Sequence, residues 1–330
     1  MTYRRTGQQM LAPRECRLFS KKDKGRLLHR ERDERGVAST VGTIMALLVF
    51  LTFLTLFTNS YVPVWMTDNE RTHMNTVFNQ FGDLKGKVDN LVVMAQVTGS
   101  TDMSLYAPIT LGAAGIPVFA SPTAGQLNYM PLNQEKSTVR IKFSYGLDIN
   151  HQTLLVDSQG GGMVELYAPN RYYVEQRIAY ENGAILVKQA DGQLVRAFPS
   201  FEVNREGSNV SFSFTEIDFV GKNASMAGTG ITGLNIDLIY LDRQTYTNLS
   251  FLSGNQVQVS LNIAITLHTL YGKAWYSYLS ETLHDSGLVN NTDYSMQVMA
   301  PDYSVITLNL KTVSTFVYNK ATVEVAVQNA

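Results

Sequence analysis

One apolar stretch decides the fold of the N-terminal part of the chain: VGTIMALLVFLTFLTLF, which runs from Val41 to Phe57. No residue from Val37 to Thr67 carries a charge, and this run exceeds the roughly 20 residues that a helix needs to cross a bilayer. The eleven Leu, Ile, Phe and Val side chains from Val41 to Phe57 each favour insertion by about 0.3 to 0.6 kcal/mol near the membrane centre. We therefore predict a transmembrane helix over residues 37–66.

Two other interpretations of this stretch fit the sequence less well. A buried helix of a soluble protein is seldom apolar on every face over such a length. A cleavable secretory signal has a shorter basic region and a small-residue cleavage site, whereas here 36 residues come first and NSYVPVW follows. Tyr61 and Trp65 stand where an aromatic belt belongs at the outer face of the membrane. Pro63, between them, is expected to kink the helix or to mark its exit.

The charges are distributed unevenly around the apolar stretch. Residues 1–36 contain 11 of the 27 basic residues and 5 of the 28 acidic ones, which gives them a net charge of +6 and leaves −7 for the rest. Basic segments stay on the cytoplasmic side of a membrane. The pattern predicts a single-pass protein with a cytoplasmic N-terminus and an extracellular C-terminal domain. A nucleic-acid-binding tail would interleave aromatic residues with the basic ones, so we expect no nucleic-acid partner.

After the apolar stretch, residues 67–100 have the pattern of an amphipathic helix. Apolar residues recur at spacings of four and three, a heptad-like stripe made of Val77, Phe81, Leu84, Val88, Leu91 and Ala95. Gly82 and Gly86 each weaken a helix by about 1 kcal/mol relative to Ala, so its middle is expected to bend. The stripe fits two interpretations: packing on the chain's own β-domain, or a stalk that packs against copies of itself.

From about residue 101 apolar and polar residues alternate, which indicates β-strands with one buried face. The longest such run is VQVSLNIAITL, residues 257–267; RYYVEQRIAY, NVSFSF, LNIDLIYL, SVITLNL and TVEVAV alternate likewise. Asn182-Gly183 and Asp191-Gly192 supply the positive φ of tight hairpins, so a meander is predicted across 172–200. One helix over Lys273–Asp285 interrupts the strands, with Gly287 as its stop.

The predicted fold class is therefore α+β. A long N-terminal helix, formed by the membrane span and its amphipathic extension, precedes a predominantly antiparallel β-sandwich or barrel-like domain over residues 101–330. The β-domain fits either one or two subdomains.

The sequence contains little that indicates catalysis. The five histidines show no zinc-ligand spacing, and Cys16 is the single cysteine, so no intrachain disulfide forms. Gly160-Gly161-Gly162 lacks the Lys-Ser/Thr of a phosphate loop, which favours a flexible turn. We expect no enzyme, cofactor or metal site. Four N-glycosylation sequons lie beyond the span, at Asn209, Asn223, Asn248 and Asn290.

The junction before the span, ERGVASTVGTI at residues 34–44, is the most specific motif of the chain. It resembles the prepilin-type (class III) signal of archaeal type IV pilin-like proteins, and the resemblance covers about residues 30–60. By this resemblance residues 1–36 are a leader that a membrane peptidase removes after Gly36, and Val37 becomes the new N-terminus. The leader is long for the class, and Val41 stands where many bacterial pilins carry Glu. The remaining 294 residues are many for a major pilin.

The resemblance implies a pilin-like structural or adhesion subunit of the cell surface, assembled through its apolar helix into a type IV pilus-like filament or pseudopilus. The implied partners are membrane lipid, the prepilin peptidase, the pilus assembly machinery and neighbouring subunits. The departures favour a minor or accessory protein. An uncleaved, single-pass membrane-anchored binding module is the alternative. A tethered hydrolase would require a bound metal or two facing carboxylates.

Overall fold

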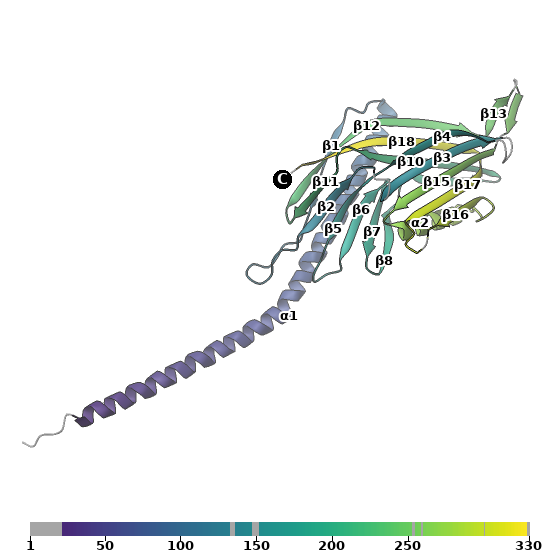
Figure 1. Ribbon diagram of the computed structural model, residues 1–330. Helices are drawn as coiled ribbons and strands as arrows, with labels where there is room; N and C mark the ends of the chain where they lie inside the picture. The colour runs from purple at the N-terminus through teal and green to yellow at the C-terminus, as the bar shows by residue number, and fades with distance from the viewer. Residues whose placement is uncertain are drawn as a thin grey trace, which may run out of the picture. The chain divides into compact units, whose positions relative to one another are not determined.

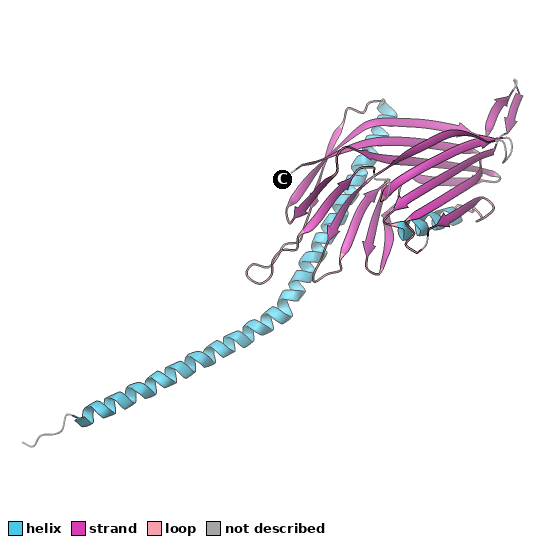
Figure 2. Cartoon of the chain, viewed as in Figure 1, coloured by secondary structure: helices cyan, strands magenta, loops and turns pink. Residues whose placement is uncertain are grey.

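A computed structural model of the protein describes residues 22–132, 136–146, 152–252, 255–258, 260–299 and 301–328. The chain divides into two compact units, Met1–Ser60 and Tyr61–Ala330. Helix α1, Lys22–Thr98, supplies the described part of the first unit and the beginning of the second (Figure 1). Nearly all the rest of the second unit is β-strand, as Figure 2 shows in magenta. A long apolar helix followed by a mostly antiparallel β-domain is the fold that the sequence predicts.

Helix α1 is continuous where the sequence suggested a boundary. It begins at Lys22, inside the basic leader, and runs through Pro63, Gly82 and Gly86 to Thr98. Pro63 has no N–H for the carbonyl one turn earlier, yet it does not end the helix. The Thr67 hydroxyl donates a hydrogen bond to the Pro63 carbonyl at 2.8 Å. The predicted segments 37–66 and 67–100 are thus parts of one helix.

The apolar stripe of α1 packs on the chain's own β-domain. All six stripe residues are buried, and Val77, Phe81, Leu84 and Val88 have no exposed surface. They belong to one hydrophobic core with residues of the β-domain, which we call the helix core. Each such side chain contributes about 1.5 to 3 kcal/mol by leaving water. Of the two interpretations of the stripe, packing on the β-domain is therefore the one that the fold adopts.

The end of α1 is set by a glycine. Gly99 has φ +72°, and its N–H donates to the Ala95 carbonyl at 2.9 Å. A residue in the left-handed region at this place caps the last carbonyls of a helix, and glycine adopts it without strain. The predicted end of the amphipathic helix near residue 100 is confirmed.

Eighteen strands follow within the described residues: β1 (Ser104–Thr110), β2 (Gly125–Met130), β3 (Ser137–Gly146), β4 (Gln152–Gly161), β5 (Met163–Ala168), β6 (Gln176–Glu181), β7 (Ala184–Gln189), β8 (Gly192–Ala197), β9 (Phe201–Glu206), β10 (Asn209–Val220), β11 (Ala224–Gly228), β12 (Ile231–Thr247), β13 (Leu249–Leu252), β14 (Asn255–Gln258), β15 (Ser260–Thr269), β16 (Tyr294–Val298), β17 (Val305–Val313) and β18 (Thr315–Gln328). Helix α2, Gly272–Asp285, lies between β15 and β16.

The strands form three larger sheets and one two-stranded ribbon, β13-β14. The sheets have the orders β1-β12-β18-β10-β9, β11-β2-β5-β6-β7-β8 and β16-β17-β15-β3-β4. Among the pairs of described strands only β10 and β18 run parallel, from Ser211 beside Thr315 to Val220 beside Glu324. β18, the last described strand, thus lies inside its sheet between β12 and β10 (Figure 1).

Strands β10 and β18 contribute to two different cores from their two faces. Ile217, Phe219, Ala321 and Val323 belong to the helix core. On the opposite faces of the same strands, Phe212, Phe214, Phe316 and Tyr318 belong to a second core, the α2 core, which also contains Trp275 and Leu279 of α2. Because side chains alternate along a strand, Glu216, Asp218 and Lys320 lie on the face that looks toward the α2 core.

Helix α2 and the first hairpin agree closely with the sequence. Trp275, Tyr278, Leu279 and Leu283 of α2 are buried together, and Gly287 follows with φ +75°. Asn182 and Gly183 turn from β6 into β7 with φ +45° and +79°. The Asn182 side chain also accepts the Ile217 N–H at 2.9 Å, which ties the turn to β10.

Three local expectations about strands are wrong. Gly192 is the first residue of β8 and is not in the left-handed region, because the turn is made by the two residues before it. The strand expected from residue 171 begins only at Gln176. The run VQVSLNIAITL is divided between β14 and β15. Its residues Leu261, Ile263, Ile265 and Leu267 are buried as expected, whereas the side chains of Val257 and Val259 lie outside the described residues.

Candidate functional site

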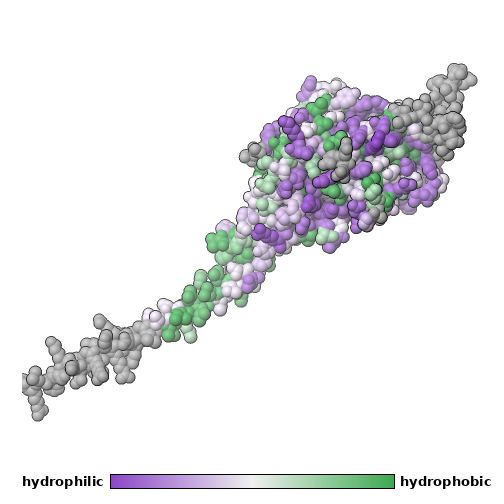
Figure 3. All heavy atoms as spheres, viewed as in Figure 1, coloured by the Kyte–Doolittle hydropathy of each residue, from purple (hydrophilic) through white to green (hydrophobic). Residues whose placement is uncertain are grey.

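The N-terminal part of α1 presents an apolar surface that the described chain does not cover. Ten large apolar side chains between Val41 and Leu56 are 44 % to 70 % exposed. The helix is long and apolar enough to span a membrane, with a mean hydropathy of 2.3 in its most apolar window and no part of that window buried. Figure 3 shows these residues as green spheres on the helix. Such a surface is characteristic of a segment that lipid or another protein covers.

The threonines of this segment have partners on their own helix. Thr52 donates its hydroxyl to the Val49 carbonyl, Thr55 to Leu51 and Thr58 to Leu54, at 2.8 to 2.9 Å. Their hydroxyls are thus satisfied without a neighbouring helix, which is the usual arrangement for threonine in an apolar helix. The segment can therefore sit in lipid with no exposed donor.

At the start of the second unit, α1 has one buried and one aromatic face. Tyr61 and Trp65 are about half exposed, and their ring centroids lie 6.4 Å apart. Val62 and Met66, on the other side, are buried. The aromatic pair follows the apolar segment directly, as expected of an interfacial belt.

One turn further on, Glu70 fastens α1 to two loops of the β-domain. Its carboxylate accepts hydrogen bonds from the Thr123 hydroxyl at 2.7 Å and from the N–H groups of Arg171, Tyr172 and Tyr173 at 2.7 to 3.0 Å. Burial by itself would raise the pKa of Glu70, but these four donors lower it overall. The carboxylate therefore stays ionised where no water reaches it. We call this group the Glu70 clamp.

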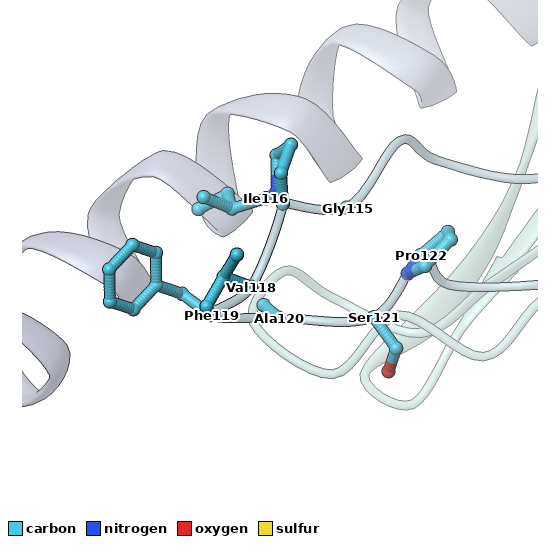
Figure 4. A pocket seen from close by; sticks show the side chains of 8 residues that line it. Gly115, Ile116, Val118, Phe119, Ala120, Ser121 and Pro122 are labelled. Carbon is cyan, nitrogen blue, oxygen red and sulfur yellow. The ribbon is translucent and has the colours of Figure 1, made fainter.

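Both clamped loops carry exposed apolar side chains. In the first, residues 115–122, the backbones of Ile116 and Ala120 exchange two hydrogen bonds of 2.9 Å, and Figure 4 shows the side chains around this turn. At its tip Val118 is fully exposed with φ +70°, and Phe119 is 41 % exposed. A positive φ is costly for a β-branched residue. In the second loop Tyr172 and Val174 are exposed to a similar extent.

The predicted processing residues and the sequons do not gather into one site. Gly36 and Val37 lie within the helical backbone of α1, and their side chains lie outside the described residues. Asn209 begins β10, Asn223 precedes β11, and Asn290 follows α2, all three exposed, whereas Asn248 is half-buried between β12 and β13. Each sequon thus stands alone at an element boundary.

A cluster of charged groups lies between β10, β18 and β4, on the side of the α2 core. Lys320 Nζ lies 3.4 Å from Asp218 Oδ2 and 3.8 Å from Glu216 Oε1. Glu216 Oε2 accepts hydrogen bonds from the hydroxyls of Tyr318 and Ser158. Glu216 has no exposed surface, and this burial raises its pKa to about 7 against the opposing effect of Tyr318 and Lys320. We call these residues the Glu216 cluster.

The glycine run of residues 160–162 belongs to this cluster. All three glycines are buried, at the point where the chain leaves β4 for β5. A Cβ on Gly160 would lie 2.2 Å from Glu216 Oε1, and the Gly161 N–H donates to Asp218 Oδ1 at 3.3 Å. The expected flexible turn is therefore wrong. Gly160 is there because Glu216 and Asp218 leave no room for a Cβ, and Gly161 and Gly162 have φ +135° and +93°, which glycine adopts without strain.

A second buried acidic pair lies near α2. Glu165 accepts hydrogen bonds from the Tyr271 hydroxyl at 2.7 Å and from Arg177 at 3.3 Å, and Glu181 accepts one from Thr269 at 2.9 Å. Burial raises the pKa of Glu181 to about 8, although the hydrogen bond from Thr269 acts in the other direction. A carboxyl of this kind holds a proton at neutral pH.

Sequence reasoning missed all of these carboxyl groups. The one available signal was in SFTEIDFV, where Glu216 and Asp218 occupy alternate positions of an apolar strand and must share a face. Glu70 gave no signal of its own, because its partners are backbone amides 101 to 103 positions away. Of the histidines, His73 is buried with Nε2 3.0 Å from the Thr110 carbonyl oxygen, and burial lowers its pKa.

No group of three or more His, Cys, Asp or Glu side chains in the described part of the chain is placed to hold a metal ion. In comparisons with known proteins, no family model matches the chain, and no curated protein or solved structure is significantly similar to it.

Proposed function

We propose that the protein is a pilin-like subunit of the cell surface, cut after Gly36 and held through its apolar helix first in the membrane and then in a type IV pilus-like filament or pseudopilus. The observation that carries the proposal is the difference in exposure between the two ends of α1. The stripe residues between Val77 and Ala95 are buried against their own β-domain, whereas residues 41–56 expose most of their apolar side chains. A helix built in this way offers one end to lipid or to other helices and keeps the other for its own domain.

The proposal gives the leader and the junction distinct roles. The basic residues of 1–36 hold the N-terminus at the anionic cytoplasmic face of the membrane. The glycine at position 36 lets a membrane-bound peptidase approach the backbone closely. After cleavage, assembly moves the apolar surface of residues 41–56 from lipid to neighbouring helices. The part played by the protein is structural or adhesive, not enzymatic.

In the proposed topology the β-domain lies outside an archaeal cell and the chain crosses the membrane once. Three of the four sequons have exposed asparagines, which supports their use as glycosylation sites on that side. The loops of the Glu70 clamp adjoin the helix turn that follows Tyr61 and Trp65. Their exposed Val118, Phe119, Tyr172 and Val174 then face the lipid headgroups, where apolar tips next to an aromatic belt are stabilised.

The alternative is an uncleaved, membrane-anchored binding module. It is supported by the complete burial of the α1 stripe, because a β-domain that covers its own helix needs no neighbouring subunit to be stable. In that case the apolar segment remains in lipid, and residues 1–36 remain attached.

Mass spectrometry of the protein from its own cells separates the two functions. We expect a mature N-terminus at Val37, and recovery of the protein in filaments sheared from the cells. Gly36→Leu should leave only the precursor. Gly42→Leu is the matched control, because a Cβ on Gly42 meets no atom within 4 Å; this change should leave cleavage intact. An intact leader on the wild-type protein, with membrane fractionation and no filaments, would favour the binding module instead.

A further inference from the structure

The Glu216 cluster brings one lysine, Lys320, close to two carboxyl groups, those of Asp218 and Glu216, and is therefore more than a single ion pair. Lys320 and Glu216 are register partners on the parallel strands β18 and β10, and Asp218 follows two residues later on the same face. The Lys320 amine lies within 4 Å of one oxygen of each carboxyl group. Lys320, Asp218 and Glu216 are thus held by two hydrogen-bonded strands that cannot move apart without breaking the sheet.

The remaining contacts leave one atom free to accept a proton. Glu216 Oε2 is occupied by the hydroxyls of Tyr318 and Ser158, whereas Oε1 is buried without a hydrogen-bond partner and faces the amine. A Glu whose pKa is raised to about 7 can accept and return a proton at neutral pH. On the other carboxyl, the Gly161 N–H points at Asp218 Oδ1, where a negative charge would develop during attack on Cγ.

We propose that Lys320 and Asp218 form an intramolecular isopeptide bond, with Glu216 as the proton carrier. The proposal is independent of the pilin-like function, because it concerns only the β-domain. The bond would join β18 to β10 in a chain whose single cysteine, Cys16, cannot form an intrachain disulfide. A covalent cross-link between segments far apart in sequence stabilises a fold mainly by restricting the unfolded chain.

The reaction balances without any further reagent. The Lys320 ammonium gives a proton to Asp218 Oδ2, which leaves a neutral amine beside a neutral carboxylic acid. The Nζ lone pair attacks Cγ, the N–C bond forms, and the negative charge on Oδ1 is stabilised by the Gly161 N–H. Glu216 takes a proton from Nζ and returns it to the Oδ2 hydroxyl. The Cγ–Oδ2 bond then breaks, one water leaves, and Glu216 is unchanged.

Proximity alone does not produce such a bond, and the chain contains a control for this. Lys85 and Asp89 on α1 are closer, with 2.8 Å between Nζ and Oδ2. That pair lies in a helix, and its aspartate is 38 % exposed. No carboxyl of raised pKa stands beside it, and water screens its charges. It should remain an ordinary ion pair.

The test is the intact mass of the full-length protein, purified in detergent and then fully denatured. We expect a mass lower by one water than the mass of the same polypeptide calculated from its observed ends. Tandem mass spectrometry of a digest should place the loss in a branched peptide that joins Asp218 to Lys320. A full mass, or a loss of water located elsewhere, such as a succinimide at Asp191-Gly192, would overturn the proposal.

Three variants separate the roles. Lys320→Arg keeps the positive charge but has no nucleophilic amine, so the chain should show its full mass. Glu216→Gln keeps the shape and loses the proton carrier, so the cross-linked fraction should fall at least tenfold; an undiminished fraction would refute the role given to Glu216. Lys85→Arg should leave the loss of one water unchanged, and a full mass in this variant would place the bond at Lys85 and Asp89 and overturn the proposal. The wild-type mass decides the main point even if a variant fails to fold.

Discussion

The Thr123 hydroxyl donates a hydrogen bond of 2.7 Å to the carboxylate of Glu70, across 53 positions of sequence. Together with the three hydrogen bonds from the N–H groups of Arg171, Tyr172 and Tyr173, it joins α1 to two loops, one between β1 and β2 and one between β5 and β6. A single side chain on the helix thus sets the position of both loops at the start of the β-domain. Replacement of Glu70 should therefore affect both loops as well as the helix.

Glu70→Gln should destabilise the β-domain. The amide keeps the shape of the side chain but offers one acceptor oxygen in place of two, and it carries no charge. Two of the four hydrogen bonds to a buried anion are lost, so we expect a loss of about 2 to 3 kcal/mol. Thermal unfolding of the full-length protein in detergent measures it. Glu206→Gln is the control, because Glu206 is exposed and its change should leave the transition where it was.

Phe81→Ala should lower the stability of a single chain. Phe81 is fully buried in the helix core, and removal of such a ring costs about 3 to 5 kcal/mol. Val97→Ala, on an exposed residue of the same helix, should change stability by less than about 0.5 kcal/mol. Unfolding should be followed at two protein concentrations. A midpoint that depends on concentration, with Phe81→Ala acting only on association, would contradict packing on the chain's own domain.

The β-domain should be more stable in mild acid than in mild base. Glu181 and Glu216 have their pKa raised to about 8 and about 7 in the folded chain, against the ordinary 4.5 of the unfolded one. Between these values the folded chain binds more protons than the unfolded chain, so its stability falls as the pH rises. We expect the unfolding temperature to be highest near pH 5 and to decline through pH 8.

Glu181→Gln provides the control for this pH dependence. The amide is neutral at every pH, so the decline between pH 5 and 8 should become shallower. Glu70, whose pKa is lowered, acts in the opposite direction and only as the pH falls below its ordinary value. An unfolding temperature that rises steadily from pH 5 to 8 would show that Glu181 and Glu216, whose pKa values are raised, do not determine the pH dependence of stability.

A fluorescent probe at Val118 should contact lipid. In a chain carrying Cys16→Ser, Val118→Cys labelled with an environment-sensitive dye should be quenched by spin-labelled headgroups in nanodiscs. Leu194→Cys is the matched control, because Leu194 is similarly apolar and half exposed but lies on β8. A third probe at Leu48 reports on the span itself. If the probe at Leu48 is quenched while the probes at Val118 and Leu194 are quenched equally, the helix is anchored in lipid but the loop does not contact it.

The elements that the sequence predicted are those specified by nearby residues. The stripe of α1, helix α2 and the Asn182-Gly183 turn each follow from spacing within about 20 positions. The long helix formed by the membrane span and its amphipathic extension was predicted as well; of the two roles expected of Pro63, the exit from the helix is wrong, because the helix continues past it and the Thr67 hydroxyl donates to the Pro63 carbonyl.

The candidate sites could not be derived from the same patterns. The Glu216 cluster depends on a parallel pairing between Glu216 and Lys320, and alternation in either strand says nothing about which strand lies beside it. The Glu70 clamp depends on backbone N–H groups, which every residue except proline carries. The visible sign of the Glu216 cluster was a polar residue within an apolar strand, whereas Glu70 showed no such sign, and in both places the partners were far away in the sequence.

The position of β18 has a consequence for biosynthesis. Because this strand fills the middle of its sheet, β12 and β10 cannot be bridged until residues 315–328 have left the ribosome. The earlier strands must wait in an unfinished state with open edges, which are prone to pair with other chains. A nascent chain that stalls before residue 315 would therefore be a target for quality control and not a shortened working protein.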